Sequence, residues 1–174
     1  MATMPGPRTV RRIWLLTVCG AALWLAGIFL APWLAARGAG GASRIVYALY
    51  APVCHQIPGR SFRLHGHPLA VCGRCLGIYA GFAAGLLVYP LVRGFSRTDL
   101  PRARLFVLLT MPLAIDGMAG LLGIWRSPIG LRFATGLVWG GLLPCYLVAG
   151  LADLAGARRE RAAARALEKA GQTK

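Results

Sequence analysis

Four long apolar stretches separated by polar segments dominate the chain. They cover residues 13–36, 70–92, 105–125 and 133–151. Each is close to or above the ~18 residues that allow a helix to cross a bilayer. The first stretch is longer than the apolar core of a cleaved signal peptide, so we interpret it as a retained helix. The pattern predicts an all-α polytopic membrane protein with four transmembrane helices.

The polar segments divide the chain further. Residues 1–12 form a basic N-terminus, residues 13–155 the transmembrane domain, and residues 156–174 a charged tail that we expect to be a short exposed helix or a frayed end. The longest internal polar segment is the loop 37–69 between the first two spans. Glycines make its start flexible, and Ser43 is the candidate N-cap of a short amphipathic helix that Pro52 ends.

The basic residues are distributed unequally between the two ends of the predicted bundle. Thirteen Lys and Arg residues lie on the side of both termini, and seven lie on the side of the loop 37–69. The excess of positive charge marks the cytoplasmic side of a membrane protein. We therefore predict that both termini are cytoplasmic and that the loop faces outward.

Composition changes the picture in two ways. The net charge is +15, but the arginines lie between or beyond the apolar stretches, which argues against nucleic acid and favours the lipid bilayer and its anionic head groups as partners. Small residues also recur every four positions in two spans, a pattern typical of close helix packing in lipid. The seam Gly77, Gly81 and Gly85 would pack either within the chain or between copies in a homo-oligomer, and Gly136 with Gly140 forms a second seam.

Three cysteines and a histidine gather around the loop. Cys72 and Cys75 form a Cys-x-x-Cys pair at the start of the second span, and Cys54 precedes His55. Thiolates at this spacing hold one tetrahedral ion, so we predict a metal site with Cys54, His55, Cys72 and Cys75 as ligands. Zinc is favoured, with iron as the other candidate. His65 or His67 could replace His55 as the fourth ligand. The alternative without a metal is that the cysteines are ordinary thiols in a packed helix contact.

Asp116 is the acidic residue inside an apolar span. A carboxylate there is costly unless it faces a partner or a polar cavity. Arg74, Arg126 and Arg132 are candidate partners, and we expect a buried pair of Asp116 with Arg132 below the metal site. Asp116, Arg74 and Arg132 are the candidates for any catalytic role.

Two other functions stay open. A thiol–disulfide oxidoreductase would use Cys72 and Cys75 with Cys54 as resolving thiol and a quinone as electron acceptor. Four spans with an outward Cys-x-x-Cys are similar to quinone-linked disulfide-generating membrane enzymes, although the third loop lacks their second cysteine pair. The outward arginines would alternatively bind, or act on, a phosphorylated lipid.

The polar motifs also carry a resemblance. Cys54-His55-Gln56, Pro58, Arg60-Ser61-Phe62, Cys72-x-Arg74-Cys75 and Gly77-Ile78-Tyr79, followed by Pro112, Asp116-Gly117, Ser127 and Leu131-Arg132, resemble an uncharacterised family of small prokaryotic membrane proteins, domain of unknown function 2085. The resemblance implies a multi-pass protein of a prokaryotic cytoplasmic membrane, with no established reaction. The chain departs from the expected pattern at Met118-Ala119-Gly120 and Pro128-Ile129-Gly130.

Overall fold

The computed structural model describes residues 6–95 and 102–172. For residues 159, 160 and 166–172 it describes the backbone and not the side chains. The elements in chain order are α1 (Pro7–Ala36), α2 (Gly40–Tyr50), the 3-10 turn η1 (Pro58–Arg60), β1 (Arg63–Leu64), β2 (His67–Pro68), α3 (Gly73–Val92), α4 (Ala103–Leu121) and α5 (Ile129–Gln172). Within this described part, α1, α3, α4 and α5 are long and apolar enough to cross a membrane. The chain is an all-α polytopic membrane protein, as the apolar pattern predicts.

The outer surface of the bundle is apolar. Leu16 and Leu23 on α1 are 74 % and 77 % exposed, and Leu91 on α3 is 85 % exposed. Such leucines would be unfavourable in water but match the hydrocarbon chains of a bilayer. Lipid is therefore the solvent that this surface fits.

The two glycine seams pack against each other. A Cβ atom at Gly77 would lie 2.1 Å from the carbonyl oxygen of Phe133, and one at Gly140 would lie 2.1 Å from that of Ile78. Only a residue without a side chain permits this approach of α3 and α5. Of the two packings left open for Gly77, Gly81 and Gly85, the structure shows the one within the chain, because α5 occupies that seam.

Helix α1 is attached to the bundle by polar groups as well as apolar ones. The Trp14 indole donates a 2.7 Å hydrogen bond to the carbonyl oxygen of Leu86 on α3. The Tyr50 hydroxyl donates a 2.6 Å bond to the carbonyl of Trp24. The two bonds engage α1 at positions ten residues apart, so the helix is held at more than one point along its length.

The loop between the first two spans is folded. Helix α2 begins at Gly40, before the expected cap, and Ser43 instead donates a 2.9 Å hydrogen bond to the carbonyl of Ala31 on α1. A short hairpin follows, with two residues in each strand: Arg63 pairs with Pro68, and Leu64 pairs with His67. Its turn places His65 at φ 50° and Gly66 at φ 82°, a pair of left-handed conformations typical of tight hairpins.

The spans differ from their expected bounds mainly at the C-terminal end. Helix α5 continues from the fourth span through the residues expected to form a separate tail. The segment after residue 156 is rich in Ala and Arg, which have high helix propensity, and this explains why the helix does not stop.

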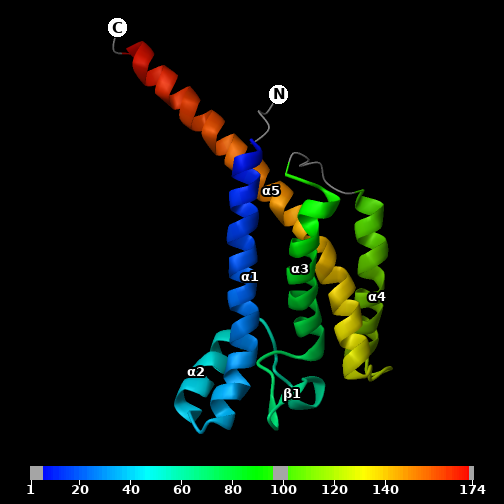
Figure 1. Ribbon diagram of the computed structural model, residues 1–174. Helices are drawn as coiled ribbons and strands as arrows, with labels where there is room; N and C mark the ends of the chain where they lie inside the picture. The colour runs from blue at the N-terminus through cyan, green and yellow to red at the C-terminus, as the bar shows by residue number, and fades with distance from the viewer. Residues whose placement is uncertain (1–5, 96–101, 173–174) are drawn as a thin grey trace.

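The two described ends of the chain, at the start of α1 and the end of α5, lie at the same end of the bundle (Figure 1). The hairpin and α2 lie at the opposite end, beside the start of α3 (Figure 1). This agrees with an even number of passes. Which end faces the cytoplasm stays a prediction from the distribution of charge.

Candidate functional site

The three loop cysteines meet at the N-terminus of α3. Cys54 follows α2, Cys72 is the N-cap residue of α3, and Cys75 lies in the first turn of that helix. Their sulfur atoms all lie within 4.8 Å of one another. All three are free thiols. The fold of the loop thus brings together cysteines that are well separated in the sequence.

Backbone donors surround the sulfur of Cys54. The amide N–H of Cys72 lies 3.1 Å from this Sγ atom, and that of Gln56 lies 3.5 Å from it. Cys54 itself is only 6 % exposed. N–H groups directed at a sulfur compensate negative charge on it, which is the environment that a bound thiolate requires.

The surroundings of Cys72 make its thiol acidic. Hydrogen bonds from the Cys54 side chain and then from Cys75 hold the pKa of the Cys72 thiol well below its ordinary value, against the opposing effect of burial. The backbone N–H groups of Cys75 and Arg74 contribute in the same direction. The cluster therefore favours at least one thiolate.

The histidines do not join the sulfur atoms. Within the described residues, the group of ligand atoms within 4.8 Å contains Cys54, Cys72 and Cys75 alone. His55 is exposed and lines the pocket beside the cluster. His65 and His67 belong to the hairpin. The structure thus gathers three of the four expected ligands and leaves His55 at the edge of the same pocket.

Asp116 pairs with Arg74. The carboxylate is 7 % exposed and accepts a hydrogen bond from the guanidinium of Arg74. This corrects the expected pairing with Arg132. The correction has a geometric reason: Arg132 lies at the start of α5, where its Nε donates a 3.0 Å bond to the carbonyl of Ser127.

A pocket of about 380 Å³ connects these groups. Its lining includes the three cysteines and the side chains of Arg60, Arg74 and Arg132. Helix α4 contributes Gly117, Gly120 and Leu121 to the wall. Two of the candidate catalytic residues, Arg74 and Arg132, therefore lie around one pocket with the candidate metal ligands, and Asp116 is bound to the first of them.

Sequence reasoning missed the role of Gln56. Its Nε2 donates to the carbonyl of Tyr47 on α2 at 2.7 Å and to that of Ala70, just before α3, at 2.9 Å. The signal available in the sequence was its position directly after Cys54-His55. A polar residue at that point, beside a cluster of thiols, is a candidate for holding the ligands in place.

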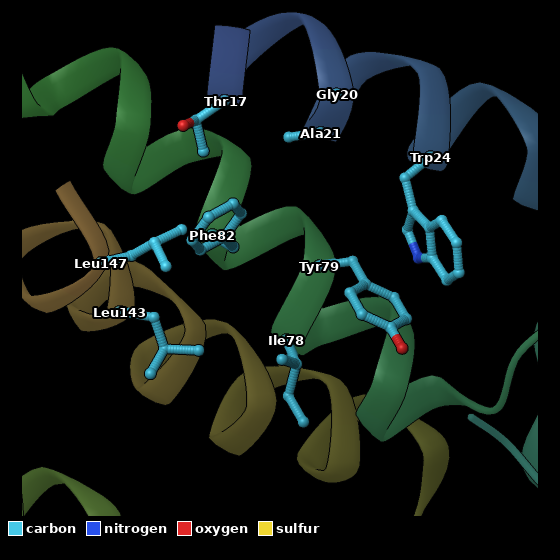
Figure 2. Close-up of a pocket in the computed structure, with 9 residues that line it drawn as sticks. All are labelled: Thr17, Gly20, Ala21, Trp24, Ile78, Tyr79, Phe82, Leu143 and Leu147. Carbon is cyan, nitrogen blue, oxygen red and sulfur yellow. The ribbon is translucent and has the colours of Figure 1, made fainter. Parts of the chain in front are cut away.

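A second pocket is apolar and lies between α1, α3 and α5. Its volume is about 440 Å³, and Figure 2 shows Trp24 and Tyr79 at one end and Thr17, Phe82 and Leu147 toward the other. Tyr79 lies one helical turn after Cys75. The groove thus begins close to the cysteine cluster and continues along the membrane-spanning part of the bundle.

Comparison with known proteins gives a family but no reaction. A family model described as "Predicted membrane protein (DUF2085)" matches residues 54–146. An uncharacterised protein of Methanocaldococcus jannaschii is 33 % identical over 144 residues, which cover 80 % of this chain and 92 % of the relative. An uncharacterised protein of Methanothermobacter thermautotrophicus is 40 % identical over 86 residues, or 49 % of this chain and 75 % of the relative. No solved structure matches the chain.

Proposed function

This chain belongs to the DUF2085 family of membrane proteins, and we propose that it binds one metal ion, zinc in preference to iron, through Cys54, Cys72 and Cys75. The matched region begins at the first of these cysteines and includes the other two. The ion would lie at the end of the bundle where α3 begins. The proposal rests on one observation, the convergence of three sulfur atoms.

The spacing of the sulfurs suits a small tetrahedral ion. Zinc–sulfur bonds of about 2.3 Å at tetrahedral angles require sulfur atoms ~3.8 Å apart. The three Sγ atoms already lie within 4.8 Å of one another, so side-chain rotations alone would complete the contraction. Soft thiolate ligands favour zinc or iron over magnesium or calcium.

The fourth ligand decides what the metal does. His55 is adjacent to Cys54 and lines the same pocket, so rotation of its side chain is the shortest route to a set of three thiolates and one imidazole. A site with four protein ligands is closed, and it would pin the first loop onto α3. If His55 stays away, the fourth position faces the pocket and is open to an exogenous ligand.

We further propose that the protein lies in a prokaryotic cytoplasmic membrane with this site facing outward. The four apolar helices and the archaeal relatives support such a location. The basic residues at the other end of the bundle would then contact anionic head groups of the cytoplasmic leaflet.

Elemental analysis of detergent-purified protein tests the metal proposal. We expect about one zinc per chain, lost in Cys54→Ser and Cys72→Ser and retained in the control Cys19→Ser, because Cys19 lies on the exposed face of α1. His55→Gln separates the two ligand sets: weaker zinc binding supports three cysteines with a histidine, and unchanged binding supports an open site of three cysteines. Absence of metal from folded wild-type protein prepared with zinc would refute the proposal.

The apolar groove favours one alternative function. In a thiol–disulfide oxidoreductase, the thiols of Cys72 and Cys75 would form a disulfide, and their two electrons and two protons would reduce a quinone to a quinol. The groove of Figure 2 has the apolar lining that a quinone requires and begins one turn from Cys75. Cys54 would act as the resolving thiol.

Thiol counting separates this alternative from the metal site. Oxidation of the purified protein by a soluble quinone, with loss of two free thiols and formation of one quinol per chain, would support the oxidoreductase. Three thiols that are protected from alkylation until a chelator is added would support the metal. The control Cys145→Ser should change neither result, because Cys145 packs on the other cluster of the core, with Leu86 and Tyr89.

A further inference from the structure

The pocket beside the cysteine cluster carries more positive charge than its own residues neutralise. We propose that it binds a phosphate group, either as free phosphate or as the head group of a lipid, through Arg60, Arg74 and Arg132. This inference goes beyond metal binding and does not require the ion. It rests on the charge balance of the pocket, the burial of Arg132 and the position of the pocket at the start of α3.

The charge balance favours an anion. Three guanidinium groups line the pocket, and a single carboxylate, that of Asp116, pairs with one of them. With Cys72 as a thiolate, one positive charge remains, and a phosphate group supplies a charge of about −1.5 to −2 at neutral pH. If zinc is bound by three thiolates, the metal complex carries a charge of −1. Together with Asp116 it neutralises two of the three arginines, and one positive charge remains.

The other carboxylates of the described part of the chain are too distant to supply the missing charge. The sequence has no acidic residue before Asp99, which lies outside the described residues. On α5, the next acid after Arg132 is Asp153, about 30 Å away along the helix at 1.5 Å per residue. The charge balance therefore favours an anion from outside the chain.

Arg132 is the strongest single observation. Its side chain is only 6 % exposed and lines the pocket. Within the described residues it has no ion pair, and its Nε is used by the carbonyl of Ser127. A buried guanidinium without a directly paired carboxylate is costly, whereas its planar donors are suited to phosphate oxygens. Its position indicates that a ligand neutralises it.

The start of α3 contributes to the same space. The pocket also lies at the N-terminus of α3, a 20-residue helix whose first N–H groups favour an anion. Arg60 lies in η1. Its backbone carbonyl oxygen is close to Gly73, so this residue is held beside the start of α3.

Size and depth are consistent with a phosphate that carries a substituent. A volume of about 380 Å³ is at the lower end of the range for small-molecule sites. The pocket lies where α3 begins, at the end of the spanning segments and hence near the depth of lipid head groups. Both a soluble phosphate and a lipid phosphate would reach it there.

Calorimetric titration of the detergent-purified full chain tests the proposal. The probes are inorganic phosphate and short-chain phosphatidic acid, with short-chain phosphatidylcholine as the neutral control. We expect Arg60→Gln and Arg132→Gln to weaken binding about tenfold or more, since each removes a charged hydrogen-bond donor. Arg126→Gln is the matched control, because it removes the same charge at the same end from an exposed residue that does not line the pocket.

Each outcome has a defined meaning. Binding of inorganic phosphate alone identifies a soluble ligand, and binding of phosphatidic acid alone identifies a lipid head group; both support the site. Absence of binding to both probes, or equal weakening in Arg126→Gln and Arg60→Gln, would overturn it. Arg60 is exposed, so its variant remains informative if Arg132→Gln fails to fold. Zinc measured in the same samples shows separately whether the metal proposal holds.

Discussion

Gln56 is a single residue that fixes the geometry of the cysteine cluster. Its side-chain amide donates to the carbonyls of Tyr47 and Ala70, and its own backbone N–H is directed at the sulfur of Cys54. It adopts this position at φ 50°, in the left-handed region. The residue thus joins α2, the loop and the start of α3 at the point where the three sulfurs meet.

Replacement of Gln56 by Glu tests whether its two side-chain hydrogen bonds stabilise the loop. The substitution keeps the size of the side chain but directs a carboxylate at two carbonyl oxygens. We expect a loss of about 2–4 kcal/mol of unfolding free energy, from two lost hydrogen bonds and an unpaired charge. Thermal unfolding in detergent measures it. Gln56→Met should cost less, and equal stability of all three proteins would show that the two hydrogen bonds do not stabilise the loop.

The ion pair of Arg74 and Asp116 makes a different prediction. Asp116→Asn leaves the Arg74 charge without its partner, and we expect a loss of about 2–4 kcal/mol, reduced by the partial exposure of Arg74. The double variant Arg74→Met with Asp116→Leu should recover most of that loss. A double-mutant cycle from Arg74→Met, Asp116→Leu and their combination measures the coupling of the pair as unfolding free energies, and additive effects would contradict the pairing.

Single-residue contacts were only partly predictable. The Cys-x-x-Cys spacing and the separate Cys-His indicated which thiols would meet, because the other two cysteines, Cys19 and Cys145, lie inside apolar spans. The partner of Asp116 was assigned to Arg132 instead of Arg74, since three arginines were available and the sequence does not show how α4 is rotated. Such a choice depends on angles between helices, which apolar patterns leave open.

At the scale of whole elements, the contact of α3 with α5 dominates the packing. The carbonyls of Phe133, Leu137 and Gly141 face Gly77, Gly81 and Gly85. Gly136 and Gly140 in turn face the backbone of Arg74 and Ile78. The two seams interdigitate, so Arg74 on α3 and Arg132 on α5 are held on a common rigid frame.

A methyl group in the seam should separate these helices. A Cβ atom at Gly81 would lie 2.2 Å from the carbonyl oxygen of Leu137, a backbone atom that cannot rotate away. We expect Gly81→Ala to lower the unfolding free energy by about 1–3 kcal/mol. Gly150→Ala is the control, because its Cβ would meet nothing within 4 Å. Equal melting temperatures of the two variants would contradict the packing described above.

The elements themselves were largely predictable, and their arrangement was not. Runs of apolar residues defined four spans because the hydrocarbon thickness sets a minimum length. The seam could not be assigned to α5 or to a second chain, since the same small residues serve both contacts. The loop 37–69 was expected to begin flexibly at its glycines, but Ser43 and Tyr50 bind α1 and order it.

The whole molecule has a polarity that can be measured. The hairpin and the start of α3, where Cys72 and Cys75 lie, are at one end, and the last part of α5 is at the other (Figure 1). The distribution of Lys and Arg predicts that the basic end is cytoplasmic. The arrangement of the helices alone is compatible with both orientations, so labelling is required.

Two exposed positions allow that labelling. Gly59 lies in η1, and a side chain added there would meet nothing within 4 Å. Ala163 is an exposed residue near the C-terminal end of α5. Each is replaced by Cys in a separate variant. We expect a membrane-impermeant maleimide to label Gly59→Cys in intact cells and Ala163→Cys only after permeabilisation. Peptide mass spectrometry distinguishes these sites from the native cysteines. The reverse pattern would invert the orientation and place the cluster in the cytoplasm.

Helix α5 has a mechanical consequence. Its 44 residues extend about 66 Å at 1.5 Å per residue, roughly twice the ~30 Å hydrocarbon thickness of a bilayer. One continuous helix therefore carries Arg132 near its N-terminal end and a basic arm at its C-terminal end. Pro144 removes one rung of its hydrogen-bond ladder and marks where it would bend. Because α3 packs against the part of α5 before Pro144, a bend at Pro144 would redirect the basic arm while Arg132 keeps its place beside the pocket.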